Sequence, residues 1–283
     1  MSSAPPLDPR AVAALSCPVC AAPLWSEPGG LACGAGHRFD RARQGHVTLL
    51  PPGHRAPSGD SAEMVADRVA FLEAGHYAGV TRALIEAVGE PVRGTLLDLG
   101  GGTGHHLAGV IDGQPDAVGV VLDSSPYAAR RAARVHSRAI AVVADTWARL
   151  PVADAAIDRV LVVFAPRNGS EIARVLRPAG RLVVVTPADD HLGELVGPLG
   201  LLRVDPDKAT RLAASLEPHL EPVDEASHRE RLRLDRAAVA TLVGMGPHAR
   251  HLARDDVRTS LAALPEALDV TVSIRVGTYR RSS

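Results

Sequence analysis

The feature that most constrains the fold is the stretch from residue 96 to residue 106, whose sequence is LLDLGGGTGHH. It begins as an apolar run, as in a buried strand, and then breaks into a turn that contains four glycines. Leu107, Val110 and Ile111 follow at helical spacing, so the stretch predicts a strand, a turn and a helix, the βα unit of a parallel sheet. Because glycine lets a backbone approach a ligand closely and the helix begins with free N–H groups, we expect a ligand at this turn.

The glycine spacing narrows the choice of ligand. The dinucleotide fingerprint GxGxxG fails, because its last position, counted from Gly100, is His105. The turn instead reads Asp-x-Gly-x-Gly-x-Gly, with Asp98 inside the strand. This pattern resembles motif I of class I S-adenosylmethionine (AdoMet) methyltransferases, where glycine backbone lies against the methionine part of the cofactor and carboxylates bind its amine and ribose. An ordinary βα turn is the alternative.

Carboxylates also end the next two predicted strands. Strand 118–122 is followed by Asp123, about 20 residues beyond the glycine turn, where a carboxylate can accept both ribose hydroxyls. A helix cap, formed by Asp123 or Ser125, is the alternative. Strand 139–144 is followed by Asp145, which suits the adenine amine, and an apolar neighbour, Trp147, suits the face of the ring.

The regular alternation of strands and helices predicts an α/β fold. Further strands are expected at 159–163 and at 181–186, the latter after a turn at 177–180, and late strands at 232–234 and 270–276. We therefore expect a class I, Rossmann-like AdoMet methyltransferase fold with a mostly parallel seven-stranded sheet and a ligand at the carboxyl ends of its strands.

A metal-binding pattern precedes this domain. All three cysteines fall early, as the CxxC pair Cys17 and Cys20 and then Cys33, with His37 four positions later. Two such knuckles supply four ligands for tetrahedral zinc, and a site closed by four protein ligands is structural. A disulfide is less consistent with the sequence, because one of the three cysteines would be left over and no secretion signal is present. A redox pair is also less consistent with it, because no βαβ pattern surrounds the CxxC.

A local group of basic residues follows the metal ligands, and Pro/Gly-rich segments at 51–53 and 57–59 mark a linker. The group is either a solvated face or a surface that binds phosphates. Its members are Arg38, Arg41, Arg43, His46, His54 and Arg55.

Composition excludes several classes of protein. The net charge of −1 excludes a broadly basic nucleic-acid binder, although 30 of the 31 cationic residues are Arg, which contacts phosphates in a bidentate way. No apolar run reaches the roughly 18 residues of a membrane span, and the first residues lack the layout of a signal peptide. We expect a cytoplasmic protein without membrane contact.

The loop after the fourth strand constrains the chemistry. Its sequence, Phe164-Ala165-Pro166-Arg167, departs from the Asn/Asp-Pro-Pro-aromatic pattern of enzymes that methylate exocyclic amines. Carbon-5 methylation of a pyrimidine needs a cysteine nucleophile, and the metal centre takes every cysteine. Direct in-line transfer to nitrogen or oxygen remains.

Taken together, these motifs resemble the RlmA family of 23S rRNA guanine-N1 methyltransferases. The resemblance runs from Cys17 nearly to the C-terminus, and the segments that carry it are CPxC, RFDRARQGHVTLL, GDSAEM, FLEAGHY, LDLGGGTGHH, FAPRN and TPADDHLGEL. GGGTGHH and FAPRN look like the Gram-positive branch that includes the tylosin-resistance enzyme, whereas the enterobacterial branch has a cysteine and a glutamate in the glycine turn.

The resemblance implies methylation at N1 of guanine 748 in hairpin 35 of 23S rRNA, with resistance to tylosin-type macrolides as its purpose in that branch; the other branch implies guanine 745. It implies a homodimer that forms a cleft for the RNA hairpin, and zinc at the Cys3His set. It places AdoMet against Tyr77, Gly102, Thr103 and His191. With Asp98, Gly100, Asp123 and Asp145, these make up the expected cofactor site.

The expected regions are an N-terminal zinc-ribbon RNA-recognition domain (1–57), a helical linker or lid (58–90) and the AdoMet-dependent methyltransferase domain (91–283). Within the last, Arg167 is the expected catalytic group, because it follows the fourth strand and could stabilise charge on guanine O6. Two alternatives stay open: a small-molecule methyltransferase, and a zinc-ribbon protein with a degenerate, inactive domain.

Overall fold

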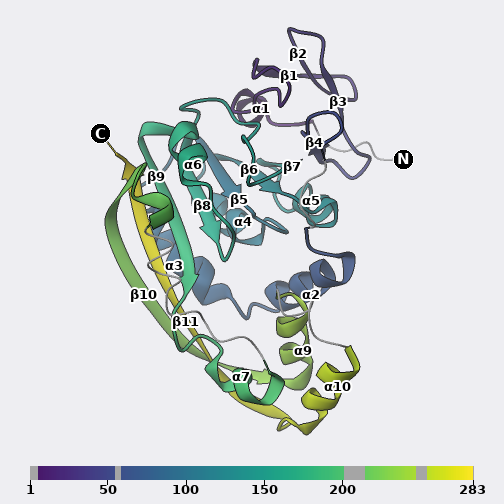
Figure 1. The fold of residues 1–283 in the computed structure, drawn as a ribbon, viewed down its shortest axis with the longest axis vertical. Coiled ribbons are helices and arrows are strands. Elements are labelled where there is room, and N and C mark those ends of the chain that lie inside the picture. The colour runs from purple at the N-terminus through teal and green to yellow at the C-terminus, as the bar shows by residue number, and fades with distance from the viewer. Residues whose placement is uncertain (1–5, 55–58, 201–213, 247–253, 283) are drawn as a thin grey trace.

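The computed structural model describes residues 6–54, 59–200, 214–246 and 254–282. Within them, an eight-stranded sheet forms the centre of the molecule and a three-stranded sheet lies in the N-terminal region (Figure 1). In spatial order the large sheet consists of β10 (Leu220–Asp235), β11 (Ala267–Arg281), β9 (Leu176–Pro187), β8 (Ile157–Val163), β5 (Thr95–Leu99), β6 (Val118–Asp123), β7 (Ala139–Val143) and β4 (Val47–Thr48).

The direction of the strands confirms the expected fold class. β9, β8, β5, β6 and β7 pair in parallel, and β11 runs antiparallel between β9 and β10. The seven expected strands are all present, and β4 adds an eighth, because Val47 and Thr48 pair in parallel with Val142 and Val143 of β7. The segment predicted as the N-terminal domain therefore also completes one edge of the main sheet.

The late strands are much longer than their alternating segments predicted. β10 and β11 pair along almost their whole lengths of 16 and 15 residues. β9 likewise begins before the expected turn at 177–180. Ile157 pairs with Leu176, and Arg159 pairs with Arg181. Residues 177–180 therefore form a bulge in β9 between two registers of its pairing with β8.

Both faces of the sheet are buried, which explains its continuous apolar runs. Leu96 packs on the face that α3 and α4 cover, whereas Leu97 packs on the opposite face. The helices are α1 (Pro9–Ala13), α2 (Ala62–Glu73), α3 (Ala78–Val88), α4 (His105–Asp112), α5 (Pro126–Ala132), α6 (Gly169–Val175), α7 (Gly193–Leu199), α9 (Arg236–Gly244) and α10 (Arg254–Ala263). None of the described helices has the length and apolar character needed to cross a membrane.

The small sheet consists of β1 (Leu24–Glu27), β2 (Gly30–Cys33) and β3 (Arg38–Asp40), all antiparallel. Its buried residues Leu24 and Leu31 belong to the same apolar cluster as Leu97 of β5. The metal-ligand region is therefore packed onto the main sheet by a shared core. The expected boundary at residue 57 lies outside the described residues.

Candidate metal centre and cofactor site

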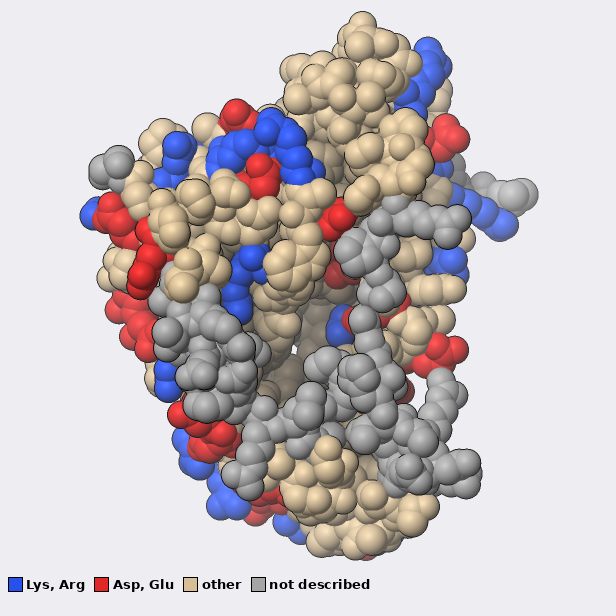
Figure 2. Space-filling model, in the orientation of Figure 1, with Lys and Arg blue, Asp and Glu red and all other residues tan. Residues whose placement is uncertain are grey.

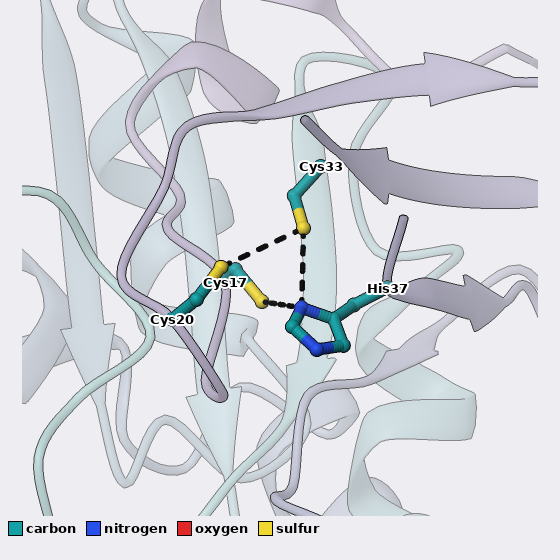
Figure 3. A group of neighbouring side chains, drawn as sticks. All are labelled: Cys17, Cys20, Cys33 and His37. Atoms are coloured by element: carbon teal, nitrogen blue, oxygen red, sulfur yellow. Dashed lines mark hydrogen bonds between the residues drawn. The ribbon is translucent and has the colours of Figure 1, made fainter. Parts of the chain in front are cut away.

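The four predicted metal ligands converge at one point of the N-terminal region. Their ligand atoms all lie within 4.8 Å of one another (Figure 3). His37 Nδ1 lies 3.5 Å from Cys17 Sγ and 3.4 Å from Cys33 Sγ, and the sulfurs of Cys20 and Cys33 are 3.7 Å apart.

These distances match the edges of a coordination tetrahedron. Zinc–sulfur bonds of about 2.3 Å and zinc–nitrogen bonds of about 2.0–2.1 Å place two sulfurs about 3.8 Å apart, and sulfur and nitrogen about 3.6 Å apart. Burial works against a thiolate at Cys33, but backbone N–H groups of Ala35 and His37 and the His37 side chain lower its pKa to about 6. The residues fit a structural zinc ion, which would hold the two knuckles together.

The basic residues beside this centre differ in how far they are exposed to solvent. Arg41 is half-buried and donates from Nε to the Gly45 carbonyl oxygen at 2.9 Å, and His46 is buried. Arg38 and Arg43 are exposed, and Arg55 lies outside the described residues. A contact with phosphates therefore depends mainly on Arg38 and Arg43.

The glycine turn after β5 has the backbone that only glycine adopts readily. Gly100, Gly102 and Gly104 have φ angles of 70°, 56° and 75°. A Cβ at Gly100 would lie 2.6 Å from the Cβ of Ala165, which follows β8. The turn and the loop after β8 therefore touch at the carboxyl edge of the sheet, and Thr103 is buried within the turn.

Asp98 fits the role of partner to the AdoMet ammonium group. Its side chain is 1% exposed, and Oδ1 has no hydrogen-bond partner in the described part of the chain. Burial, with a smaller effect of the nearby Asp123 carboxylate, raises the pKa of Asp98 to about 7. Since buried carboxylates are normally hydrogen-bonded, this oxygen is open to a hydrogen-bond donor of a ligand, and an ammonium group is one such donor.

Asp123 links the glycine turn to β6. Its Oδ2 accepts a hydrogen bond from the backbone N–H of Gly102 at 2.8 Å, and its Oδ1 accepts one from Ser125 at 2.8 Å. Burial raises the pKa of Asp123, although these two bonds favour the charged form. Helix α5 is capped by the Ser125 hydroxyl, so Asp123 is not the cap and keeps lone pairs for ribose hydroxyls.

Asp145 follows β7 and is held from two sides. Its Oδ1 accepts the backbone N–H of Trp147 at 2.8 Å, and its Oδ2 lies 2.9 Å from His54 Nε2. Trp147 is 57% exposed. The carboxylate expected to bind the adenine amine is thus also joined to the segment that follows the metal centre.

Tyr77 and His191, which the resemblance places against AdoMet, both contact the ring of a third residue, Phe164. The Phe164 ring centroid lies 6.1 Å from that of Tyr77 and 5.6 Å from that of His191. Tyr77 is buried, which raises the pKa of its phenol, and His191 Nδ1 accepts the backbone N–H of Ser273 at 3.2 Å. The structure therefore brings these two distant residues together through Phe164.

Two histidines of the glycine-turn motif sit at the start of α4. Burial, with smaller effects of His105 and Arg68, lowers the pKa of His106 to about 3. Neutral His106 forms a 2.9 Å hydrogen bond with the Thr81 hydroxyl, which joins α4 to α3. His106 is therefore a packing residue of the site.

Arg167, the expected catalytic group, is half-buried beyond β8, and burial lowers its pKa. Tyr279 of β11 is its electrostatic neighbour. This places Arg167 toward the β11 side of the loop, and its role stays a prediction.

Sequence reasoning missed Arg68, which projects from α2 onto the glycine turn. Its Nη1 would lie 2.9 Å from a Cβ at Gly102, and it pairs with Asp60 at 2.5 Å. Its Nη2 also donates to the Met245 carbonyl oxygen at 2.9 Å. In the sequence it is one arginine of an amphipathic helix, and no local pattern marks it as a ligand.

The fold and these two centres define a class of protein: an AdoMet-dependent methyltransferase that carries a zinc ribbon. Residues 15–56 match the family model described as the RlmA N-terminal zinc ribbon. In shape, the chain is similar to the [4+2]-cyclase SpnF, with a TM-score of 0.51, 19% identity and coverage of 81% of this chain and 98% of that one. At this identity the similarity shows the fold alone.

Two relatives identify the family, within this class of methyltransferases, to which the chain belongs. The chain is 50% identical, over 97% of its length and 99% of the relative's, to a protein of Micromonospora griseorubida named as a 23S rRNA (guanine-N(1)-)-methyltransferase. It is 49% identical, over 92% of its length and 94% of the relative's, to the 23S rRNA (guanine(748)-N(1))-methyltransferase of Streptomyces fradiae. The chain therefore belongs to the RlmA family of 23S rRNA (guanine-N1)-methyltransferases.

Proposed function

We propose that this protein transfers the methyl group of AdoMet to N1 of guanine 748 in hairpin 35 of 23S rRNA. The observation that carries the proposal is the 49% identity to the guanine 748 enzyme of Streptomyces fradiae across 94% of that enzyme. The occurrence of a zinc ribbon and a cofactor site in one chain supports the proposal, because a methyltransferase that acts on small molecules has no evident use for the ribbon.

Each cofactor residue has a definite task in this proposal. When bound, AdoMet supplies a methyl group on a positively charged sulfur. Asp98 would pair with its ammonium group and Asp123 would accept its ribose hydroxyls, while Asp145 would accept its adenine amine. Tyr77 and His191 would close the pocket beside the glycine turn.

Transfer would be direct. All three cysteines belong to the metal centre, so none is available as a covalent nucleophile. The N1 proton would pass to a base or to water, and as the N1–H bond breaks, negative charge would develop on guanine O6, where Arg167 is the group proposed to stabilise it. The bond from carbon to guanine N1 would form as the bond from carbon to sulfur breaks, with S-adenosylhomocysteine as the leaving group.

The ribbon would hold the RNA. Arg38 and Arg43 are exposed on the metal-ligand region and can reach phosphates. Because 23S rRNA is made and assembled in the cytoplasm, we expect the protein to act there, as a homodimer that forms a cleft for the hairpin. Resistance to tylosin-type macrolides is the proposed biological effect.

Radiolabelled AdoMet with purified protein and unmodified 23S rRNA tests the function, and primer extension locates the product, because N1-methylguanine blocks base pairing. The proposal predicts a stop at guanine 748 that is absent from RNA carrying adenine at that position. A stop at guanine 745 would assign the specificity of the other branch. Label in neither RNA, with the protein fully loaded with AdoMet, would contradict the proposal.

A further inference from the structure

Phe164, the first residue after β8, has an unusual backbone for an aromatic residue. Its φ angle is 52°, in the left-handed region that β-carbon-bearing residues rarely adopt. Its side chain is nevertheless 40% exposed. Strain of this kind persists only where neighbouring groups impose it, and it concentrates at ligand-binding positions.

Contacts of Phe164 and of the residues after it hold this conformation in place. The backbone N–H of Phe164 donates to the Val185 carbonyl oxygen at 3.1 Å, which fixes the end of β8 against β9. The next residue, Ala165, packs against Gly100, where a Cβ would come within 2.6 Å. Asn168 caps α6 and donates to the Trp147 carbonyl oxygen at 3.1 Å, so both ends of the loop are anchored.

The aromatic ring is also held by its neighbours without being covered by them. Tyr77 and His191 lie at ring-centroid distances of 6.1 and 5.6 Å, with interplanar angles of 50° and 40°. Tilted contacts of this kind fix the position of a ring but leave part of its face open. Since 40% of Phe164 is exposed, these two neighbours leave part of the residue accessible.

The position of the ring relates it to the methyl donor. β8 is the neighbour of β5, and both end at the same edge of the sheet, so the loop after β8 borders the glycine turn. Figure 2 shows the centre of this face hollowed, near the carboxyl end of β8 in Figure 1. Phe164, as the first residue after β8, therefore lies at the same edge of the sheet as the glycine turn proposed to bind AdoMet.

We propose that Phe164 is the platform on which the target guanine stacks after it leaves the RNA hairpin. Guanine N1 lies on the base-pairing edge, so a base must be unpaired before this atom can be methylated. Stacking on a fixed phenyl ring would hold the base plane beside the methyl donor without recognising its edges. The inference rests on the proposed function and adds the residue that positions the base.

Four variants separate stacking from structural effects. F164G removes the ring and relieves the strained backbone, so this variant should fold at least as well as the wild type. F164L keeps apolar volume without a π face, whereas F164Y keeps the π face. V223A, at another exposed apolar side chain on β10, is the matched control.

Three measurements are needed: the Kd for AdoMet by calorimetry, kcat/KM for hairpin-35 RNA, and the fluorescence of 2-aminopurine placed at position 748. We expect F164G and F164L to lower kcat/KM by roughly 10- to 100-fold with an AdoMet Kd within about twofold of wild type. F164Y and V223A should retain activity. Aminopurine bound by wild type should be quenched by stacking, and F164L should leave it brighter.

Unimpaired methylation by F164L would overturn the inference. So would an AdoMet Kd that rises in F164G and F164L by the same factor as kcat/KM falls, because the ring would then belong to the cofactor site. If the wild-type protein methylates no 23S rRNA, the proposed function itself is contradicted. If the wild-type protein is active and the variants without the phenyl ring are equally active, only the stacking role of Phe164 is contradicted.

Discussion

Replacing Asp98 with Asn should change how AdoMet affinity depends on pH. The wild-type carboxyl is buried beside Asp123 and has a pKa of about 7, and one of its oxygens lacks a partner. Pairing with the AdoMet ammonium group requires the ionised form. Binding below pH 7 must therefore release a proton, so affinity should rise with pH up to about 7.

The expected size follows from this pKa. The ionised fraction of Asp98 is about 3% at pH 5.5 and about half at pH 7, which predicts a roughly 15-fold increase in the association constant. The ammonium group stays protonated over this range, because amino groups of this type have pKa values of about 8. The Asp98→Asn variant should show no such rise, and at pH 7.5 it should bind roughly 10- to 100-fold more weakly, since it loses a charge-assisted bond.

The same substitution should stabilise the protein without ligand. The folded-state pKa of Asp98 lies above its unfolded value of 3.8. Its contribution to stability is therefore fully present below pH 3.8 and is lost as the pH rises through 7. At pH 8 the variant should gain up to about 4 kcal/mol in the free energy of unfolding, and at pH 4 almost nothing.

Isothermal calorimetry between pH 5.5 and 7.5, with urea unfolding at pH 4 and pH 8, checks both effects. Asp158→Asn, at a partly buried carboxylate that pairs with Arg177 near the amino ends of the parallel strands, is a suitable control for calorimetry. A wild-type affinity that is flat from pH 5.5 to 7, or a variant with the wild-type slope, would refute the assignment of Asp98 to the ammonium group.

Four further predictions test other parts of the site. Cys33→Ala should abolish the single equivalent of zinc and lower the melting temperature of the whole protein, because the metal region shares a core with the main sheet; an unchanged melt would contradict this. Arg43→Ala should reduce the slope of log affinity for hairpin RNA against log salt by about one, whereas Arg93→Ala, also exposed, should leave it unchanged; equal slopes in all three proteins would exclude Arg43 from the RNA surface. Arg167→Ala should lower methyl transfer by roughly 100-fold or more with AdoMet affinity nearly intact, and unchanged turnover would remove its proposed role. Arg68→Ala should weaken binding of AdoMet by roughly tenfold or more but hardly affect decarboxylated AdoMet, as expected if Arg68 meets the cofactor carboxylate; equal losses for both ligands would show that it does not.

The features predicted well from the sequence are those fixed by short-range spacing. The CxxC pair and the Cys33–His37 knuckle are each local turns, so their spacing already fixes the ligand geometry that the structure brings together. The placement of Asp98 and Asp123 at one edge of the sheet also followed from the sequence, because the parallel strands β5 and β6 end at the same edge, while their role toward AdoMet stays a prediction.

The features that were missed depend on contacts between distant segments. β4 has only two residues, too few for periodicity, and its partner Val142 lies far along the chain. A turn was predicted at 177–180, but in the structure these residues lie within β9, because the pairing of Leu176 with Ile157 begins the strand before them and a register shift accommodates them. Nothing in the sequence shows that Phe164 has a positive φ angle, because packing of its neighbours imposes that conformation.

Mass analysis of the ribonuclease fragment that contains guanine 748 tests the proposed reaction most directly. The fragment should be isolated from 23S rRNA of cells that lack an endogenous enzyme of this family, with and without expression of this protein. We predict that expression makes the fragment one methyl group heavier and that its nucleosides include N1-methylguanosine. An unmodified fragment, from cells in which the protein is folded and loaded with zinc, would contradict the assignment of this protein as a guanine 748 methyltransferase.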